Sequence, residues 1–248
     1  MSSYSFYKFE SFPEEKSLTT DPQIELQYTE IKTEFEFSQI TSKGDFDRYN
    51  VKHFTRVKFK GIPYHYKEAI DEVTELHRFN AYVNREMNLL LIKYGKAVSD
   101  EVISRFNKKF PKVKIKRLKL NLKKLLPKFR TLIGSYFKNI QVPHLKSTAL
   151  FGPGVDESQF YKMIDKLGDL SAVIVIVDYN NEDHNILISK DYTVRFYKEY
   201  IEDFEIDFLL SLKNVLDEAI EEEDISTGEM KDEASNGTQE SDLFLDLK

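Results

Sequence analysis

The chain has 248 residues, of which 41% are hydrophobic and 13% aromatic, and its formal net charge is −6 at pH 7. This is enough apolar material for a sizeable core in one large domain or two small ones. The absence of cysteine excludes disulfides, thiolate metal sites and cysteine nucleophiles. Without a long apolar run or a charged-then-apolar leader, the sequence predicts a cytoplasmic protein that does not span a membrane.

The first half of the chain is predicted to combine strands with two helices. Residues 1–20 carry no sustained period, and we expect a loosely ordered arm there. Alternating apolar and polar residues predict a bulged strand or a tight pair of strands over 24–37, and another strand over 51–61. Helical spacing predicts a helix over 64–79, followed by a hairpin that turns at 84–86. A helix that begins after Gly95 is expected to end at Pro111.

The second half repeats this mixture. Residues 112–121 alternate like a strand, and the apolar residues between Leu122 and Phe137 share one helical face, which predicts a helix beginning near Pro127. Further elements are expected in chain order. They are a strand and glycine loop over 147–154, a helix over 156–168 with Asp156 as its N-cap, strands over 172–179, 184–190 and 192–199, and a final helix over 204–216.

These elements predict an α/β or α+β fold, in which mixed sheets with hairpins are covered by amphipathic helices. The globular body is expected over residues 21–220, either as one unit or as two subdomains, 21–140 and 148–220. Residues 221–248 are rich in acidic and small polar residues, so we expect a disordered acidic tail that ends in a docking peptide.

Charge is distributed very unevenly along the chain. Residues 217–248 contain twelve acidic residues and two lysines, whereas residues 102–155 contain fourteen Lys or Arg and no acidic residue. Such segregation acts on partners and association rates more than on the fold.

Eleven of these cations form a basic block, residues 108–130, which we predict to bind nucleic acid, DNA or RNA. In the predicted strand, Lys112, Lys114 and Lys116 share a face, and in the predicted helix Lys123, Lys124 and Lys128 lie opposite the apolar stripe. Contacts of this kind release counterions from a phosphate backbone. An anionic protein, the acidic tail itself, or a merely solvated face are the alternatives. The predicted binding residues are Lys108, Lys109, Lys112, Lys114, Lys116, Arg117, Lys119, Lys123, Lys124, Lys128 and Arg130.

The chain ends in an apolar island after the acidic stretch. Residues 239–244, QESDLF, resemble the peptide by which many bacterial replication and repair proteins bind the sliding clamp. The resemblance implies that Gln239 makes polar contacts while Leu243 and Phe244 fill an apolar pocket. With Asp242, these residues are the predicted docking site for a protein partner. The alternative is a tail that folds back on the basic block and masks it.

Motifs that would define an enzyme are weak. There is no P-loop, dinucleotide fingerprint or nucleophile elbow, and the five histidines lack metal-ligand spacing, so we expect no cofactor, metal site or catalytic residue. Asp21 with Glu30-Ile31-Lys32 loosely resembles the restriction-endonuclease-like metal motif. We therefore expect a non-enzymatic accessory or regulatory protein. The alternatives are a metal-dependent nuclease of a phage-defence or repair system, and a regulatory protein that binds only other proteins.

Overall fold

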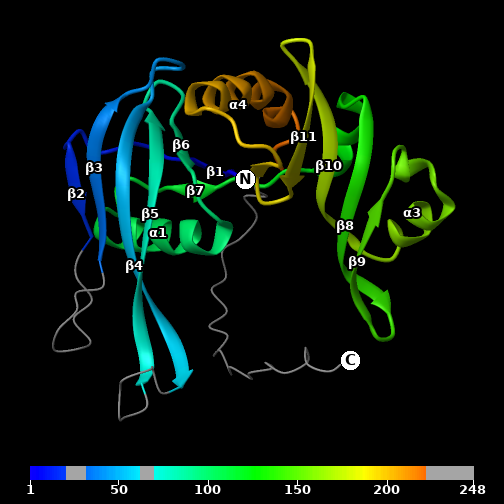
Figure 1. Cartoon of the computed structure of the whole chain (residues 1–248), viewed down its shortest axis with the longest axis horizontal. Helices are drawn as coiled ribbons and strands as arrows, with labels where there is room; N and C mark the ends of the chain where they lie inside the picture. The colour runs from blue at the N-terminus through cyan, green and yellow to red at the C-terminus, as the bar shows by residue number, and fades with distance from the viewer. Residues whose placement is uncertain (21–31, 62–69, 222–248) are drawn as a thin grey trace.

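The computed structural model describes residues 1–20, 32–61 and 70–221, which form one large sheet with helices packed on it (Figure 1). The first seven strands are β1 (Ser3–Lys8), β2 (Ser17–Thr19), β3 (Thr33–Ile40), β4 (Asp47–Gly61), β5 (Ile70–Asn84), β6 (Leu89–Ile92) and β7 (Lys116–Arg117). The others are β8 (Thr131–Val142), β9 (Leu145–Phe151), β10 (Asp169–Tyr179), β11 (Glu182–Ser189) and β12 (Thr193–Phe196). The helices are α1 (Lys96–Lys109), α2 (Leu122–Leu125), α3 (Gln159–Ile164) and α4 (Glu202–Asp217), with 3-10 turns η1 (Leu126–Lys128) and η2 (Val155–Glu157).

The strands join in a single sheet with the order β2-β3-β4-β5-β6-β1-β12-β11-β10-β8-β9, and β7 pairs with β1 outside this path. All pairings between these described strands are antiparallel. The predicted combination of hairpins with covering helices is confirmed, and its antiparallel pairing gives an α+β arrangement. None of the helices that the structure describes is both long and apolar enough to cross a membrane.

The prediction of a loosely ordered arm over residues 1–20 is wrong, because β1 lies in the middle of the sheet. It pairs with β6 on one side and with β12 on the other. Tyr4, Phe6 and Tyr7 are fully buried or nearly so. Serines and aromatic residues alternate only over Ser3–Phe6, and Tyr7 then breaks the alternation because both faces of β1 are covered.

Successive residues of β1 enter two different hydrophobic cores on opposite faces of the sheet. Tyr4 and Phe6 pack in the core beneath α4, which also contains residues of β8 and β10–β12. Tyr7 packs in the core beneath α1, which also contains residues of β3–β6. The alternation of side chains along a strand therefore lets β1 join the two cores, as the neighbouring strands β5 and β6 also do.

Helix α4 is held to the central strands by a buried carboxylate as well as by apolar packing. Glu205, 1% exposed, accepts hydrogen bonds from the Tyr4 hydroxyl at 2.6 Å and from Lys93 Nζ at 2.7 Å. A buried carboxylate with such partners fixes the helix position more strictly than apolar contacts alone.

Most of the elements predicted from periodicity are confirmed. They include the turn after Asn84, α1 with its end before Pro111, β4, β9–β12 and α4. The helix over 156–168 is shorter than predicted, since α3 spans Gln159–Ile164. Its N-cap is Ser158, whose hydroxyl accepts from the Tyr161 N–H at 3.1 Å, and not Asp156, which lies in η2. The predicted subdomain division falls inside the β8–β9 hairpin, whose strands pair with each other.

The helix predicted over 64–79 is wrong where the structure describes it. Residues 70–84 form β5, which pairs with β4 from Val83 outward along a long hairpin that projects from the sheet (Figure 1). Val73 and Leu76, part of the supposed helical stripe, are 38% and 37% exposed. Their helical spacing is incidental, because cross-strand hydrogen bonds rather than a buried stripe determine this segment.

The long helix predicted to begin near Pro127 is also wrong. Only a short turn of helix, α2 with η1, precedes β8. Leu132 and Phe137 are buried, but they belong to the strand β8 and not to a helix. A bulge between Leu132 and Gly134 shifts the alternation of β8. Because of this shift, both residues reach the same core, as they would on a helical face.

Candidate nucleic-acid interface

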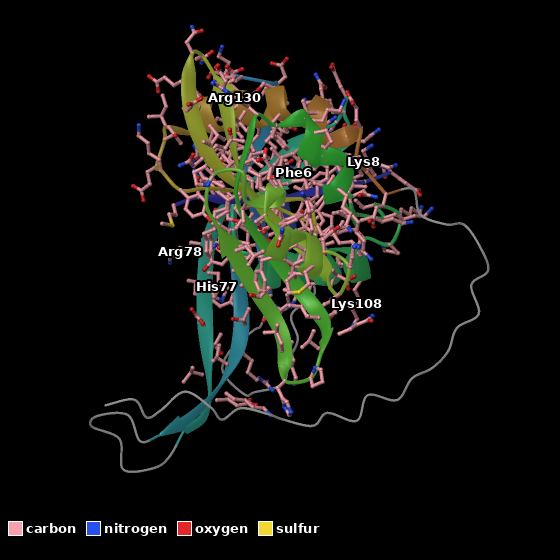
Figure 2. The ribbon with its side chains drawn as sticks, turned by 90° about the vertical axis from the view of Figure 1, so that its right-hand side faces the viewer. Phe6, Lys8, His77, Arg78, Lys108 and Arg130 are labelled. Atoms are coloured by element: carbon pink, nitrogen blue, oxygen red, sulfur yellow. The ribbon has the colours of Figure 1, made fainter. Side chains whose placement is uncertain are left out.

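The basic block runs from the C-terminal end of α1 to the start of β8, and its cations do not form one patch. Lys108 and Lys109 lie in the last turn of α1, where positive charge is favourable to the helix dipole. Figure 2 shows Lys108 and Arg130, the two ends of the block, on well-separated parts of the molecule. The block is therefore continuous in sequence but divided in space.

The strand predicted over 112–121 is largely absent. The two residues of β7 pair with β1, and Lys114 has a φ of +48°, which interrupts an extended chain. The expected alternation of burial nevertheless holds, since Val113 and Ile115 are buried while Lys112, Lys114 and Lys116 are exposed. The apolar residues anchor the segment, and the lysines project into solvent.

The side chain of Asn107 fixes this segment against α1. Its Nδ2 donates to the Ile115 carbonyl at 2.7 Å, and its Oδ1 accepts from the Ile115 N–H at 2.8 Å. A side-chain amide satisfies both backbone groups of one residue in this way, much as a neighbouring strand would. The irregular segment thus has a defined position although it has almost no strand pairing.

Arg117 belongs to the predicted binding residues, but its guanidinium is engaged inside the protein. It donates to Asp100 at 2.7 Å, to the Asp191 carbonyl at 2.8 Å and to Thr193 Oγ1 at 3.1 Å, and it also donates to the Tyr7 hydroxyl. It lies 4.6 Å from the centre of the Tyr7 ring. Arg117 therefore holds β7 to β1 and β12, and its role is to position its neighbours.

Three lysines of the block form exposed ion pairs. Lys114 lies 2.8 Å from Glu10, Lys123 lies 2.8 Å from Asp165, and Lys128 pairs with Glu218. Five further cations form no ion pair with another residue in the described ranges. They are Lys108, Lys112, Lys119, Lys124 and Arg130, all of which are exposed.

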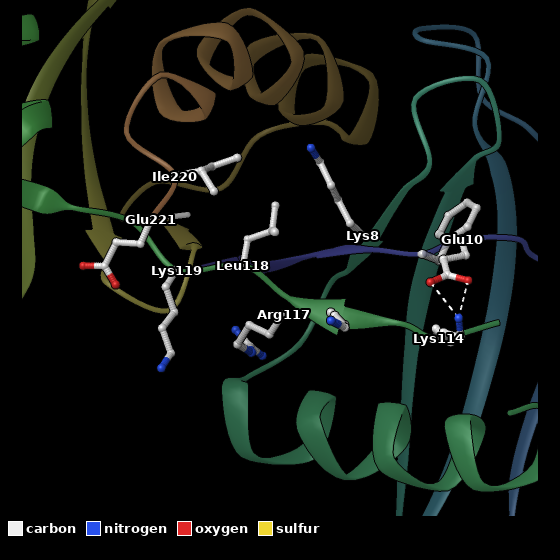
Figure 3. A pocket seen from close by; sticks show the side chains of 10 residues that line it. Lys8, Glu10, Lys114, Arg117, Leu118, Lys119, Ile220 and Glu221 are labelled. Carbon is white, nitrogen blue, oxygen red and sulfur yellow. Dashed lines mark hydrogen bonds and ion pairs between the residues drawn. The ribbon is translucent and has the colours of Figure 1, made fainter. Parts of the chain in front are cut away.

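A cavity of about 740 Å³ brings the central part of the block together (Figure 3). Its walls include Lys114, Lys116, Arg117 and Lys119. Lys8 of β1 joins them, because β1 and β7 pair with Lys8 opposite Lys116. Sequence reasoning missed Lys8, since nothing near it in the chain indicates a basic site. The cavity also contains the carboxylates of Glu10, paired with Lys114, and of Glu221.

A second polar cluster lies beneath α1, where His53 and His77 face each other across β4 and β5. Their ring centres are 6.3 Å apart. His53 Nδ1 lies 2.7 Å from Thr33 Oγ1, and His77 Nε2 lies 2.9 Å from Thr55 Oγ1. Sequence spacing did not indicate this pair, which the register of the hairpin creates. No group of three or more metal-binding side chains with suitable placement occurs in residues 1–20, 32–61 and 70–221.

Burial is the main reason why the pKa of His53 is lowered to about 4, and the positive charge of Arg105 contributes in the same direction. Glu101, whose Oε2 lies 3.7 Å from His53 Nε2, acts in the opposite direction. His53 is therefore neutral at pH 7, and its Nε2 has no hydrogen-bond partner in the described part of the chain. The cluster is a candidate for structural stabilisation rather than for binding an anion.

Several predicted site residues lie outside the described residues. They are Asp21, Glu30 and Ile31 of the nuclease-like motif, and Gln239, Asp242, Leu243 and Phe244 of the docking peptide. Lys32, the last residue of the nuclease-like motif, is described and lies 2.9 Å from Glu34. No protein-family model matches this chain, and no curated protein sequence matches it.

Proposed function

We propose that this protein is a non-enzymatic nucleic-acid-binding accessory or regulatory protein, with the basic cavity at the centre of its binding surface. The observation that carries the proposal is the meeting of Lys8, Lys116 and Lys119 around one cavity of about 740 Å³. A phosphate backbone presents regularly spaced negative charge, and lysines arranged along it gain free energy by releasing condensed counterions.

The ion pairs within the block are compatible with this function. Exposed pairs such as Lys114 with Glu10 contribute about 0–1 kcal/mol each, so a phosphate group can take the place of a carboxylate at small cost. Lys108, Lys112, Lys119 and Lys124, which form no ion pair with another residue in the described ranges, add attraction without losing such a pair. A polyanion is favoured over a small anion because the cations are spread along a surface.

The acidic tail is the second part of the proposal. Glu221 lines the basic cavity, and residues 222–248, which follow it directly, contain nine acidic residues and two lysines. We propose that these residues mask the cavity by competing with nucleic acid, or dock on a partner protein through Leu243 and Phe244. In both cases, what the tail binds decides whether the basic cavity is free to bind nucleic acid.

A salt titration of three proteins tests the proposal. Binding of labelled DNA and RNA is measured for the wild type, for a Lys8→Glu/Lys116→Glu/Lys119→Glu variant and for a chain that lacks residues 222–248. We expect the charge-reversal variant to bind weakly at low salt, with a log–log salt slope shallower by about 2–3, because roughly three phosphate contacts are lost. The shortened chain is expected to bind more tightly than the wild type at low salt.

The matched control is Lys43→Glu/Lys58→Glu/Arg78→Glu, which changes the net charge equally but alters exposed residues at the β3–β5 side of the sheet. It should retain most of the wild-type affinity. Equal loss in both charge variants would mean that only net charge matters, and unchanged binding in the cavity variant would reject the proposed surface. Unchanged affinity on removal of the tail would reject masking alone.

A further inference from the structure

We propose that the nucleic acid is single-stranded, DNA or RNA, and that it runs from the basic cavity onto the open face of the sheet formed by β8–β12. This inference rests on the proposed function and names its substrate class. It follows from a second hollow, which lies outside the basic block and has aromatic as well as cationic walls.

The second hollow has a volume of about 540 Å³ and lies over β8, β10, β11 and β12, beside the start of α1. Its cations are Lys96, Lys138, Lys190 and Arg195. Lys138 and Arg195 are exposed and form no ion pair with any residue in the described ranges. Hydroxyl groups of Ser171, Ser189 and Thr193 line the same hollow. Cations and hydroxyls together are the groups that contact phosphates and sugars in nucleic-acid complexes.

Two aromatic rings lie together on this face of the sheet. Tyr136 lines the hollow, and its ring centre lies 5.6 Å from that of Phe151 on the edge strand β9. Phe151 is 64% exposed. It lies over Gly134, where an added Cβ would come within 3.1 Å of the Phe151 ring and 2.9 Å of Ile174. Gly134 thus leaves room for the large Phe151 ring on the sheet surface. Packing in the core does not explain why this apolar ring is exposed.

The aromatic face adjoins the basic cavity through a smaller hollow of about 200 Å³ near Asn121 and Lys123. This intermediate hollow shares Asp169, Leu170 and Lys190 with the aromatic face, and shares Glu221 with the basic cavity. The three hollows are therefore linked in series by wall residues that they share. A strand that binds the lysines of the cavity can continue past Lys190 to Tyr136 and Phe151.

Exposed rings beside cations distinguish a single strand from a duplex. Bases inside a duplex are already stacked on one another, whereas unpaired bases can stack on aromatic side chains and lose affinity when such a ring is removed. A duplex can neutralise the lysines but gains little from Phe151. The placement of Tyr136 and Phe151 is therefore most useful for an unpaired strand.

The experiment measures binding of single-stranded DNA, single-stranded RNA and duplex DNA of equal length by fluorescence anisotropy. The variants are Phe151→Leu, which removes a ring from an exposed position, and Lys138→Glu/Arg195→Glu. Phe160→Leu is the control for the ring, because Phe160 is 50% exposed on α3 and lines none of the three hollows. Lys43→Glu/Arg78→Glu is the control for charge. All variants are checked for unchanged folding by circular dichroism.

We expect single strands to bind more tightly than duplex, and Phe151→Leu to weaken single-strand binding about five-fold or more with little effect on duplex. The Lys138/Arg195 variant should weaken single-strand binding and lower its salt slope, while both controls bind as the wild type does. The tighter of the DNA and RNA arms identifies the nucleic acid. Duplex binding as tight as single-strand binding, or unchanged binding by Phe151→Leu, overturns the inference. If the Lys8/Lys116/Lys119 variant still loses binding in that case, the proposed function stands; if it also binds normally, both fail.

Discussion

Arg117 illustrates, at the scale of one residue, why a count of charges is not a map of a binding site. In the sequence it is one of eleven cations, but in the structure its guanidinium contacts Asp100, Asp191 and Thr193. Its side chain is 13% exposed. Lys8, by contrast, is isolated in the sequence and joins the cavity through strand pairing. Residue type indicated a basic surface, but tertiary structure decides which cations line the cavity.

His53 supports a prediction about stability and pH. Its pKa is lowered from 6.5 to about 4. Between these pH values, His53 is therefore protonated in the unfolded chain but neutral in the folded chain. Its contribution to stability is present above pH 6.5 and is lost as the pH falls toward 4, with an upper magnitude of roughly 3 kcal/mol. We therefore expect His53→Gln to have a shallower loss of stability over this range than the wild type.

Urea unfolding at several pH values between 6.5 and 4 measures this effect. His144→Asn is the matched control, since His144 is exposed in the turn between β8 and β9. It should follow the wild-type curve. A His53→Gln curve parallel to that of the wild type would show that protonation of other groups causes the acid destabilisation.

Among the secondary-structure elements, those with a strong local pattern were predictable, and those decided by distant partners were not. α1 has an amphipathic pattern between Gly95 and Pro111, α4 has an amphipathic pattern, and β10 has a continuous apolar run that indicated a strand. The segments that became β5 and β8 also have apolar residues at helical spacing. Only pairing with β4, and with β9 and β10, makes them strands, and a single sequence does not contain the register of these pairs.

The docking peptide, residues 239–244, is a short element that lies outside the described residues, and its proposed role is testable by itself. The wild-type chain should capture a purified bacterial sliding clamp, and Leu243→Ala/Phe244→Ala should abolish capture because the apolar side chains would no longer fill a pocket. Glu240→Ala is a control at a position that the resemblance leaves unconstrained. Failure of the wild-type chain to capture the clamp would end this assignment.

At the scale of the whole molecule, two cores lie on opposite faces of one sheet and share β1. We therefore expect residues 1–221 to unfold as a single cooperative unit, rather than as subdomains divided near residue 141. Phe106→Leu on α1 and Phe208→Leu on α4 each remove part of a fully buried ring. We expect each variant to lower the free energy of unfolding by about 1 kcal/mol. This should lower the Tm by about 2–4 °C without splitting the transition.

Differential scanning calorimetry measures this directly, with the ratio of calorimetric to van't Hoff enthalpy as the criterion. Phe160→Leu, at an exposed position on α3, is the control and should leave the Tm nearly unchanged. Two separate transitions in either core variant would indicate that the cores unfold independently.

The central position of β1 also affects how the chain folds as it is synthesised. Along the chain, β1 can pair with β6 soon after it is synthesised, but its other neighbour, β12, is made much later, after β7 to β11. Contacts such as that between Ser5 and Thr193 join residues 188 positions apart in the sequence. Long-range closure of this kind slows folding, and the nascent protein has to keep an aromatic strand paired on one side only until β12 has been made.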